Sequence, residues 1–501
     1  MRKKNKSFLN PVFFISASVV LALVVVGAVN PTGFQSVATR LFGFTTHNFG
    51  WLYLIAVFVF VVFLIGICIS KYGKIKLGSK NSKPEFGFFP WIGMLFSTGF
   101  GSGLVFWGVA EPMSHFFDTP FPGLEPQTEE AARVAMGYAF FNWGISQWAV
   151  FALVGLVIAY LQFRKGKDGL ISTAVKPVVG NNPVTTTSIN SLAVIATVMG
   201  VATSLGLGIM QMSGGLSSVF ELPDGVWMQV SIALAMLLIY LLSSVSGLNR
   251  GMKWLSSINL SFCLILLVFV FVTGPTVFVL ESFVLGLGDY FTNFVAYSLR
   301  LTPYTGDDWV VDWTIFYWAW AISWSPFVGA FVARVSRGRT IRQYIFGVLV
   351  ASPAIACVWI AVFGGTSLYS DLNNGTMIAE AVDHDLAVAL FETFGTLPLS
   401  TITSFMAIVL IFTFLVTSAD SATYILGSMT SKGSMNPTLI TKFIWGGLIT
   451  AIAVVLLVAG GLEALQTASL TSALPFVVII IILMISFIKM LQRDEKDRVK
   501  N

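Results

Sequence analysis

Twelve long apolar runs, separated by short polar connections, dominate this 501-residue sequence. Each run is long enough for the roughly 20 residues that an α-helix needs to cross the hydrocarbon core of a bilayer. The runs are apolar throughout, without the alternation that is typical of a transmembrane β-strand. We therefore predict an all-α polytopic membrane protein with 12 transmembrane helices at 12–29, 51–70, 88–110, 138–161, 188–212, 227–246, 256–280, 313–333, 344–366, 401–427, 443–462 and 467–488.

The positions of Lys and Arg predict the orientation of the chain. Of the 29 Lys and Arg residues, all but Arg40, Arg133 and Arg300 lie in every second connection. Loops rich in Lys and Arg face the cytoplasm. The other connections hold most of the carboxylates and all three histidines, and we assign them to the outside. We expect a protein of the plasma membrane with short cytoplasmic tails at 1–11 and 489–501.

Composition excludes several classes of function. The chain is 56% apolar and 11% charged, whereas a soluble domain must cover itself with polar side chains. The formal charge of +5 does not indicate a nucleic-acid partner, because the basic residues are spread over seven cytoplasmic segments instead of one surface. We expect a single transmembrane domain over 1–501 with membrane lipid and a small solute as partners.

The third span contains a segment that disfavours a continuous helix. Gly99, Gly101 and Gly103 stand at every second position near its middle, where low helix propensity favours unwound backbone. Helix packing through small residues is the alternative, but glycines placed for packing usually recur four residues apart. Unwound backbone inside a membrane must line a cavity or pack on protein. This segment therefore predicts a binding site.

The eighth span carries a stripe of aromatic residues with helical spacing. Ser325-Pro326 lies in its middle and predicts an interruption of the helix. The stripe consists of Trp313, Tyr317, Trp320, Trp324, Phe327 and Phe331. We interpret Trp313 and Tyr317, near the outer boundary, as residues of an interfacial aromatic belt. Trp320 and Trp324 lie too deep for a belt.

The fourth span adds a second aromatic group. Trp148 and Phe151 share one helix face, whereas Trp143 points away from that face unless the helix is locally distorted. The tenth span holds Asp420, the one carboxylate well inside a predicted span. Such a residue is usually functional, with helix capping or bridging as the alternative.

Several motifs of the sequence resemble those of a known family. The run Phe-Tyr-Trp-Ala-Trp-Ala-Ile-Ser-Trp-Ser-Pro-Phe-Val-Gly at 316–329, followed by Arg-Val-Ser-Arg-Gly-Arg at 334–339, resembles the betaine/carnitine/choline transporters. The glycine-rich third span and Thr-Ser-Ala-Asp-Ser at 417–421 add to the resemblance, which covers essentially the whole chain. It implies a secondary transporter with a 5+5 inverted repeat of spans 3–7 and 8–12, two peripheral N-terminal helices, and a homotrimer.

The resemblance implies a site for a zwitterionic or cationic compatible solute. Aromatic faces attract a quaternary or delocalised cation, and a solute carboxylate suits the backbone N–H groups of an unwound segment. The resemblance assigns the aromatic cage and the carboxylate site to Trp143, Trp148, Phe151, Trp320, Trp324, Gly99, Gly101 and Gly103.

This chain departs from the family pattern in one wall of that cage. Ala321 stands where the sodium-coupled betaine carriers usually have a tryptophan, and Phe151 where a tyrosine is common. The missing indole leaves space for a bulkier, flatter cation such as the ring of ectoine. We expect uptake of ectoine, hydroxyectoine or glycine betaine as an osmoprotectant during osmotic stress, with choline and carnitine as alternatives.

Transport must be coupled to an ion, because the sequence contains no nucleotide-binding motif. We expect sodium as the coupling ion and no other cofactor. The resemblance implies sodium ligands at Ser97, Phe100, Phe414, Thr417 and Ser418, with Thr197 and Phe327 as further candidates. For Thr417 or Ser418 alone, a hydrogen bond to the preceding helical turn is the alternative.

A second sodium site lacks one expected ligand, because Val201 replaces the second of two family threonines, of which Thr197 matches the first. Sodium-independent members carry a fixed arginine in the fifth span. Residues 188–213 contain no charge, which favours a symporter over the alternative of an exchanger.

Two other classes of function fit the sequence poorly. A channel needs rings of like charge or repeated carbonyl filters along a pore, and the predicted spans hold one deep carboxylate. An intramembrane enzyme needs a nucleophile with a positioned base, and no histidine lies in a predicted span. We therefore predict a transporter and not an enzyme.

Overall fold

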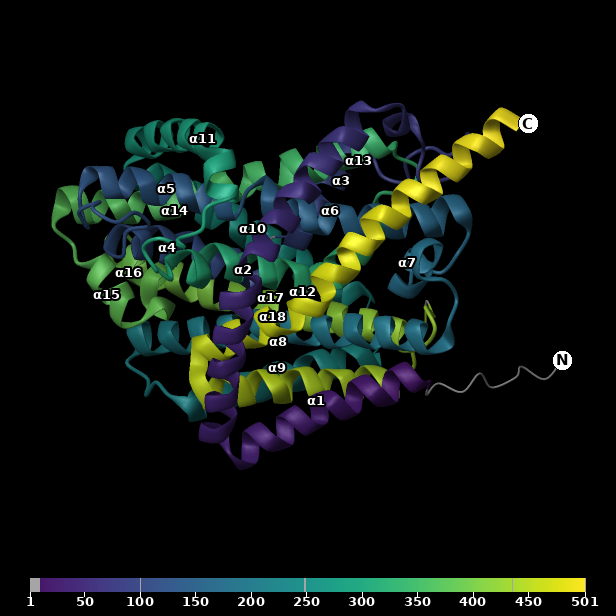
Figure 1. Cartoon of the computed structure of the whole chain (residues 1–501). Coiled ribbons are helices and arrows are strands. Elements are labelled where there is room, and N and C mark those ends of the chain that lie inside the picture. The colour runs from purple at the N-terminus through teal and green to yellow at the C-terminus, as the bar shows by residue number, and fades with distance from the viewer. Residues whose placement is uncertain (1–9, 100, 247–248, 435, 501) are drawn as a thin grey trace.

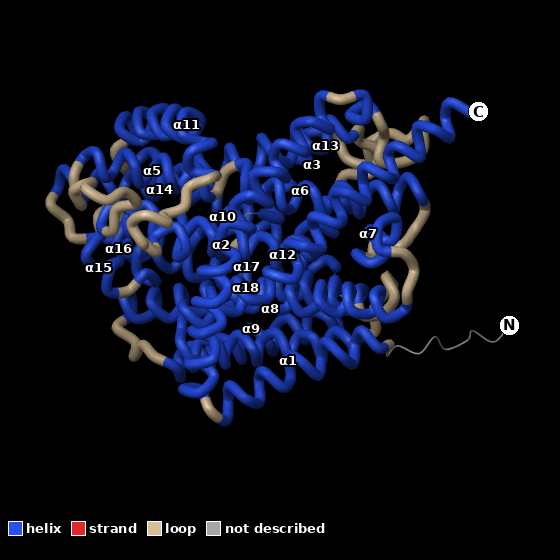
Figure 2. Tube along the Cα trace, viewed as in Figure 1, coloured by secondary structure: helices blue, strands red, loops and turns tan. Residues whose placement is uncertain are grey.

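The computed structural model describes residues 10–99, 101–246, 249–434 and 436–500. The regular secondary structure of these residues is helical. The isolated bridge between Lys76 and Thr340 is the one strand-like pairing that they contain. Nine helices of this part are long and apolar enough to cross a membrane, or up to ten if a bent pair counts as one span. Figure 2 shows helices filling the interior, with loops mainly at the periphery. The prediction of an all-α polytopic membrane protein is confirmed at this level.

The first half of the chain forms α1 (Pro11–Val29), α2 (Pro31–Ile69), η1 (Lys71–Lys74), α3 (Phe88–Gly99), α4 (Ser102–Phe117), α5 (Glu129–Asn142), α6 (Ile145–Ala159), η2 (Tyr160–Arg164), α7 (Ile171–Val179), α8 (Pro183–Phe220) and α9 (Val226–Ser246). The second half forms α10 (Asn249–Thr273), α11 (Thr276–Ser298), η3 (Val311–Ile315), α12 (Phe316–Val335), α13 (Ile341–Phe346), η4 (Gly347–Ala351), α14 (Ser352–Asn374), α15 (Ile378–His384), η5 (Leu386–Val388), α16 (Ala389–Gly395), α17 (Ser400–Met429) and α18 (Leu439–Lys500). Figure 1 places the start of α1, α7 and the end of α18 on one side, and α15 and α16 on the opposite side.

The last helical segment, α18, contains a sharp turn. Gly460 and Gly461 leave helical geometry there, with φ/ψ of −167°/18° and 56°/−130°. The positive φ of Gly461 favours glycine, because a Cβ would be strained in that conformation. The predicted spans 443–462 and 467–488 meet at this turn. Residues 489–500, which the sequence suggests as a tail, continue the helix.

The third span is broken, as its glycines predict. α3 ends at Gly99, and α4 begins at Ser102. Gly101 between them is extended, with φ −113° and ψ −175°. The first backbone N–H groups of α4 therefore lack hydrogen-bond partners within a helix and lie in the interior of the bundle.

The eighth span is continuous, so the prediction of an interruption at Ser325-Pro326 is wrong. Pro326 has no N–H to donate to the carbonyl of Ile322, four residues earlier. The Ser325 hydroxyl donates to that carbonyl instead, at 2.7 Å. Because the serine replaces the missing hydrogen bond, α12 runs from Phe316 to Val335 through the proline.

The fourth span contains the local distortion that would bring Trp143 inward. α5 ends at Asn142 and α6 begins at Ile145, so Trp143 and Gly144 form a break. The phenol oxygen of Tyr290, on α11, accepts a hydrogen bond from the Ile145 N–H at 2.9 Å. A Cβ at Gly144 would lie 2.4 Å from that same oxygen. The close packing of Tyr290 therefore requires glycine at the break.

The seventh span ends earlier than predicted. α10 ends at Thr273, and α11 leaves it at a bend of 108° across Gly274 and Pro275. A proline disfavours helical backbone at the residue before it, which ends the helix here. The next helix, α11, therefore begins at Thr276.

Candidate functional site

The broken third span meets α6, α8, α12 and α17 at a cavity lined mainly by aromatic rings. The cavity brings together most of the residues that the sequence assigns to the solute site. Its lining is Gly101, Ser102, Gly103, Leu104, Trp143, Gln147, Trp148, Phe151, Ser204, Trp320, Ala321, Trp324 and Ser418. Gly99 ends α3 and is not part of this lining.

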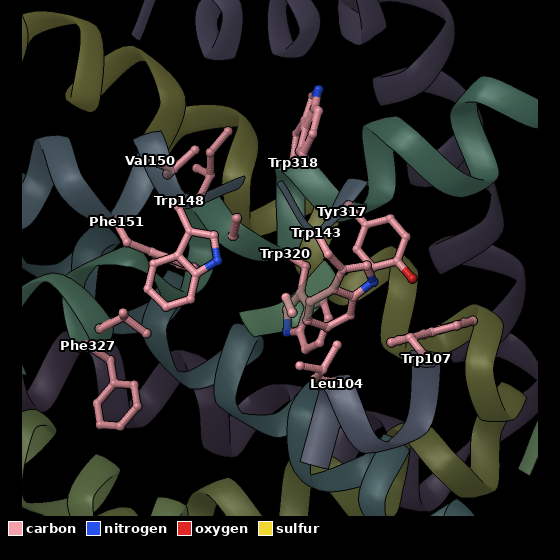
Figure 3. Packing of buried hydrophobic residues seen from close by; sticks show 14 of the residues in the cluster. Leu104, Trp107, Trp143, Trp148, Val150, Phe151, Tyr317, Trp318, Trp320 and Phe327 are labelled. Atoms are coloured by element: carbon pink, nitrogen blue, oxygen red, sulfur yellow. The ribbon is translucent and has the colours of Figure 1, made fainter. Parts of the chain in front are cut away.

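The aromatic rings form a continuous chain around the cavity. Trp148 contacts Phe151 with ring centroids 5.6 Å apart, and Phe151 contacts Trp324 at 6.0 Å. Trp324 stacks on Trp320 at 6.1 Å, and Trp320 meets Trp143 edge to face at 6.2 Å. Figure 3 shows Trp148 and Phe151 on one side, with Trp143 and Trp320 on the other. These five residues have the composition of a cation cage.

Gly103 is required for this packing, whereas a Cβ at Gly101 would make an ordinary van der Waals contact. A Cβ on Gly103 would lie 2.5 Å from the Trp320 ring, and one on Gly101 would lie 3.8 Å from the Trp324 ring. Gly103 therefore lets the indole of Trp320 lie directly on the backbone of α4. Gly103 thus brings the Trp320 ring of the cage against the backbone at the start of α4.

The start of α4 suits an anion. Its N-cap residue is Gly101, and no side chain caps the helix. The first N–H groups of a helix lack partners within that helix and carry the positive end of its dipole. Because Gly101, Ser102 and Gly103 line the cavity, a carboxylate placed there would meet backbone N–H groups.

The cavity is small in this arrangement and encloses about 20 Å³, roughly the space for one water molecule. Ala321 forms part of its wall and is buried. Trp320 donates its indole N–H to Gly200 and Ser204 of α8, at 3.3 and 3.2 Å. These bonds hold Trp320 against α8, so a larger solute requires other rings to move.

A buried carboxylate that the sequence places outside the membrane supports the cage. Glu111, on α4, has no exposed surface. Its oxygens accept hydrogen bonds from Asn142 Nδ2 at 2.8 Å, Trp143 Nε1 at 2.8 Å and Tyr317 Oη at 2.6 Å. His115 Nε2 lies 3.2 Å from the same carboxylate. Glu111 therefore joins α4, the break before α6, and α12.

This cluster corrects three predictions. Asp420 is not the only deep carboxylate, because α4 continues past Glu111 to Phe117. His115 is fully buried and packs against Trp313 with ring centroids 4.4 Å apart, so it is not a loop residue. Tyr317 is buried and bonded to Glu111, which is incompatible with a role in an interfacial belt. The apolar residues that follow Glu111 in the sequence could have indicated this longer helix.

Only some of the residues that the sequence assigns to the sodium site lie near the cavity. Ser418 lines it, and Thr417 precedes Ser418 on α17. The Thr417 hydroxyl donates to the carbonyl of Phe414 at 3.0 Å, so the alternative of a bond to its own helix is realised here. Ser97 lies in α3, and Phe100 is outside the described residues.

The further sodium candidates have packing or helical partners. Thr197 is fully buried and donates its hydroxyl to the Ala193 carbonyl at 2.7 Å. Phe327 packs against Trp324 with ring centroids 5.8 Å apart. Their roles at an ion site stay predictions.

Comparison with known proteins identifies the class of this chain. Residues 11–496 match the model of the betaine/carnitine/choline family transporters, and the chain belongs to that family. It is therefore a multi-pass membrane transporter and not an enzyme.

Similar proteins carry more specific descriptions. The chain is 70% identical over 493 residues to an ectoine/hydroxyectoine transporter of Virgibacillus pantothenticus, covering 98% of each chain. It is 43% identical over 494 residues to the glycine betaine transporter OpuD of Bacillus subtilis, covering 98% of this chain and 96% of that one. A glycine betaine transporter of Acinetobacter baylyi is 37% identical over 97% of this chain and 74% of its own length.

Proposed function

We propose that this protein is a sodium-coupled symporter that imports ectoine and hydroxyectoine, with glycine betaine as a further solute, across the plasma membrane. The observation that carries the proposal is the aromatic cavity beside the uncapped start of α4. Rings can hold a delocalised cation while the helix start holds a carboxylate. The 70% identity to a transporter described for ectoine and hydroxyectoine supports this choice of solute.

Two features of the wall favour a flat ring cation. Ala321 lines the cavity with a methyl group, which leaves room for a six-membered ring once the aromatic side chains separate. Phe151 contributes a ring face without a hydroxyl. A trimethylammonium group in this cavity would lack an aromatic contact at the position of Ala321.

The helices support a twelve-span arrangement of the family type. Each broken pair, α3 with α4 and α5 with α6, counts as one span, and α18 counts as two on either side of Gly460-Gly461. Spans 3–7 and 8–12 then form the inverted repeat, with α1 and α2 outside it. The start of α1 and the end of α18 lie on the same side in Figure 1, which together with the basic loops supports cytoplasmic termini. We further propose a homotrimer.

Sodium coupling rests on the oxygens of α17 and on the uncharged α8. Ser418 faces the cavity, and Thr417 and the Phe414 carbonyl lie within one turn of it. Hard oxygen ligands suit Na⁺. α8 contains no arginine that could replace the ion.

Uptake into proteoliposomes tests the proposal. Labelled ectoine, hydroxyectoine, glycine betaine, choline and carnitine are each offered with an inward sodium gradient or with sodium replaced by N-methylglucamine. We expect saturable ectoine uptake that requires sodium. Uptake that ignores sodium but needs solute preloaded inside the vesicles would indicate the alternative, a carnitine/choline-type exchanger.

A further inference from the structure

One buried polar side chain in the cavity wall has no hydrogen-bond partner among the described residues. Gln147, on α6, is 4% exposed and lines the aromatic cavity. Its amide makes no hydrogen bond with any residue that the structure describes. Burying an unpaired amide costs stability. The Gln147 amide atoms are not among the fully buried unpaired atoms, so they are open to a partner that enters the cavity.

Helix capping does not explain this glutamine. Gln147 is the third residue of α6, where a glutamine side chain often returns to the N–H of the N-cap residue. Gly144 is that residue, but its N–H already donates to the Phe141 carbonyl at 3.2 Å. No side chain caps α6. The start of α6, two residues before Gln147, is anchored to α11, because Tyr290 accepts from the Ile145 N–H.

The cavity offers donors and aromatic faces but few acceptors. No carboxylate lines it among the described residues, and Gln147 supplies the only side-chain carbonyl of that lining. Ser204 is engaged with Trp320, and the start of α4 offers N–H groups for an anion. A cation that carries N–H groups would thus find its strongest side-chain acceptor at Gln147 Oε1.

This acceptor distinguishes two kinds of cation. A trimethylammonium group has no N–H and is held by aromatic faces alone. The cyclic amidinium of ectoine carries two N–H groups, each of which needs an acceptor after leaving water. We propose that Gln147 accepts a hydrogen bond from the cationic N–H of the solute and thereby selects N–H-bearing cations over fully methylated ones. The proposal rests on the proposed function of the cavity as the solute site.

The test compares dissociation constants of the purified full-length protein for ectoine and glycine betaine in Gln147→Met and Gln147→Glu. Met has a similar shape and removes the acceptor, whereas Glu keeps it. We expect Gln147→Met to raise the Kd for ectoine about 10-fold to 100-fold, the cost of losing a hydrogen bond to a charged group. The Kd for glycine betaine should change by less than about threefold in the same variant. Gln147→Glu should retain ectoine binding.

Ser146→Ala is the matched control. Ser146 is buried on the same turn, has an unpaired hydroxyl and does not line the cavity. It should leave both Kd values unchanged. Equal losses of ectoine and betaine in Gln147→Met would overturn the proposal, since the amide would then donate to the carboxylate that both solutes share, or act through the fold.

A series of methylated glycines separates this proposal from the choice of ectoine as solute. Sarcosine and dimethylglycine carry two and one cationic N–H groups, and glycine betaine carries none. If the unsubstituted protein fails to bind ectoine, the proposed ectoine import is wrong. Gln147→Met should still weaken sarcosine and dimethylglycine more than betaine. A uniform response across this series would refute the role of Gln147 whatever the natural solute is.

Discussion

Removal of the Glu111 carboxylate should destabilise the cage and the fold together. In Glu111→Ala, the donors of Asn142, Trp143 and Tyr317 lose their acceptor in a site without exposed surface. Each buried donor left unpaired costs about 1–3 kcal/mol, so three cost roughly 3–9 kcal/mol. That is a large part of the roughly 5–15 kcal/mol by which folded proteins are usually stable.

Glu111→Gln separates the loss of charge from the loss of acceptors. The amide oxygen of this glutamine can still accept hydrogen bonds from Trp143 and Tyr317. Its NH₂ group would face the NH₂ group of Asn142, so the Asn142 amide must rotate to present its oxygen instead. We expect an intermediate loss of about 1–3 kcal/mol. Thermal unfolding in detergent should rank the proteins from Ala, the least stable, through Gln to the unsubstituted chain. Solute affinity should rise in the same order, from Glu111→Ala to the unsubstituted chain, because Trp143 belongs to the cage.

Glu463→Gln is the control for this series. Glu463 is an exposed carboxylate that accepts from Gln35 and Thr39 at 3.1 and 3.0 Å. Because hydrogen bonds at an exposed site compete with water, the melting temperature of Glu463→Gln should stay close to that of the unsubstituted chain. If Glu111→Ala also melted and bound solute normally, the carboxylate would not be holding the three donors.

Four further predictions concern the cage, the ion, the solute and pH. Trp148→Ala should weaken apparent affinity about tenfold or more in uptake assays, with little change in maximal rate, because a desolvated cation–π contact is lost. Thr417→Ala combined with Ser418→Ala should shift the sodium dependence of uptake to much higher concentration, and sodium-independent uptake by the unsubstituted chain would contradict the ion assignment. Ala321→Trp should favour glycine betaine over ectoine in competition, because the added indole fills the space for the larger ring. Burial raises the pKa of Asp385 above its ordinary 3.8, so its contribution to stability is complete below pH 3.8 and is lost as pH rises through the raised value. Asp385→Asn should therefore melt higher than the unsubstituted chain at pH 7 and lose that gain below pH 3.8.

Much of the architecture follows from local patterns in the sequence. Span length and apolarity are properties of contiguous residues, and alternate glycines in the third span act on their own backbone. The break between α3 and α4 could therefore be predicted. The aromatic residues of the cage could be assigned only through the family motif, because their meeting depends on the turn at Trp143 and Gly144.

Other features depend on partners that are distant in sequence or on one rotamer. Whether Pro326 breaks α12 depends on the Ser325 hydroxyl reaching the Ile322 carbonyl, and the sequence does not specify that geometry. Glu111 ends an apolar run and carries a charge, so hydropathy ends the span there. Its burial depends on donors from Asn142 and Tyr317, which the fold brings together.

The small volume of the cavity has a calorimetric consequence. The rings of Trp143 and Trp320 already contact each other edge to face and have little contact with water. A solute that enters this closed arrangement exchanges ring–ring contacts for ring–solute contacts, so the protein withdraws little additional apolar surface from water. Because the heat-capacity change of binding follows the apolar surface removed from water, the binding enthalpy of the solute should vary only weakly with temperature.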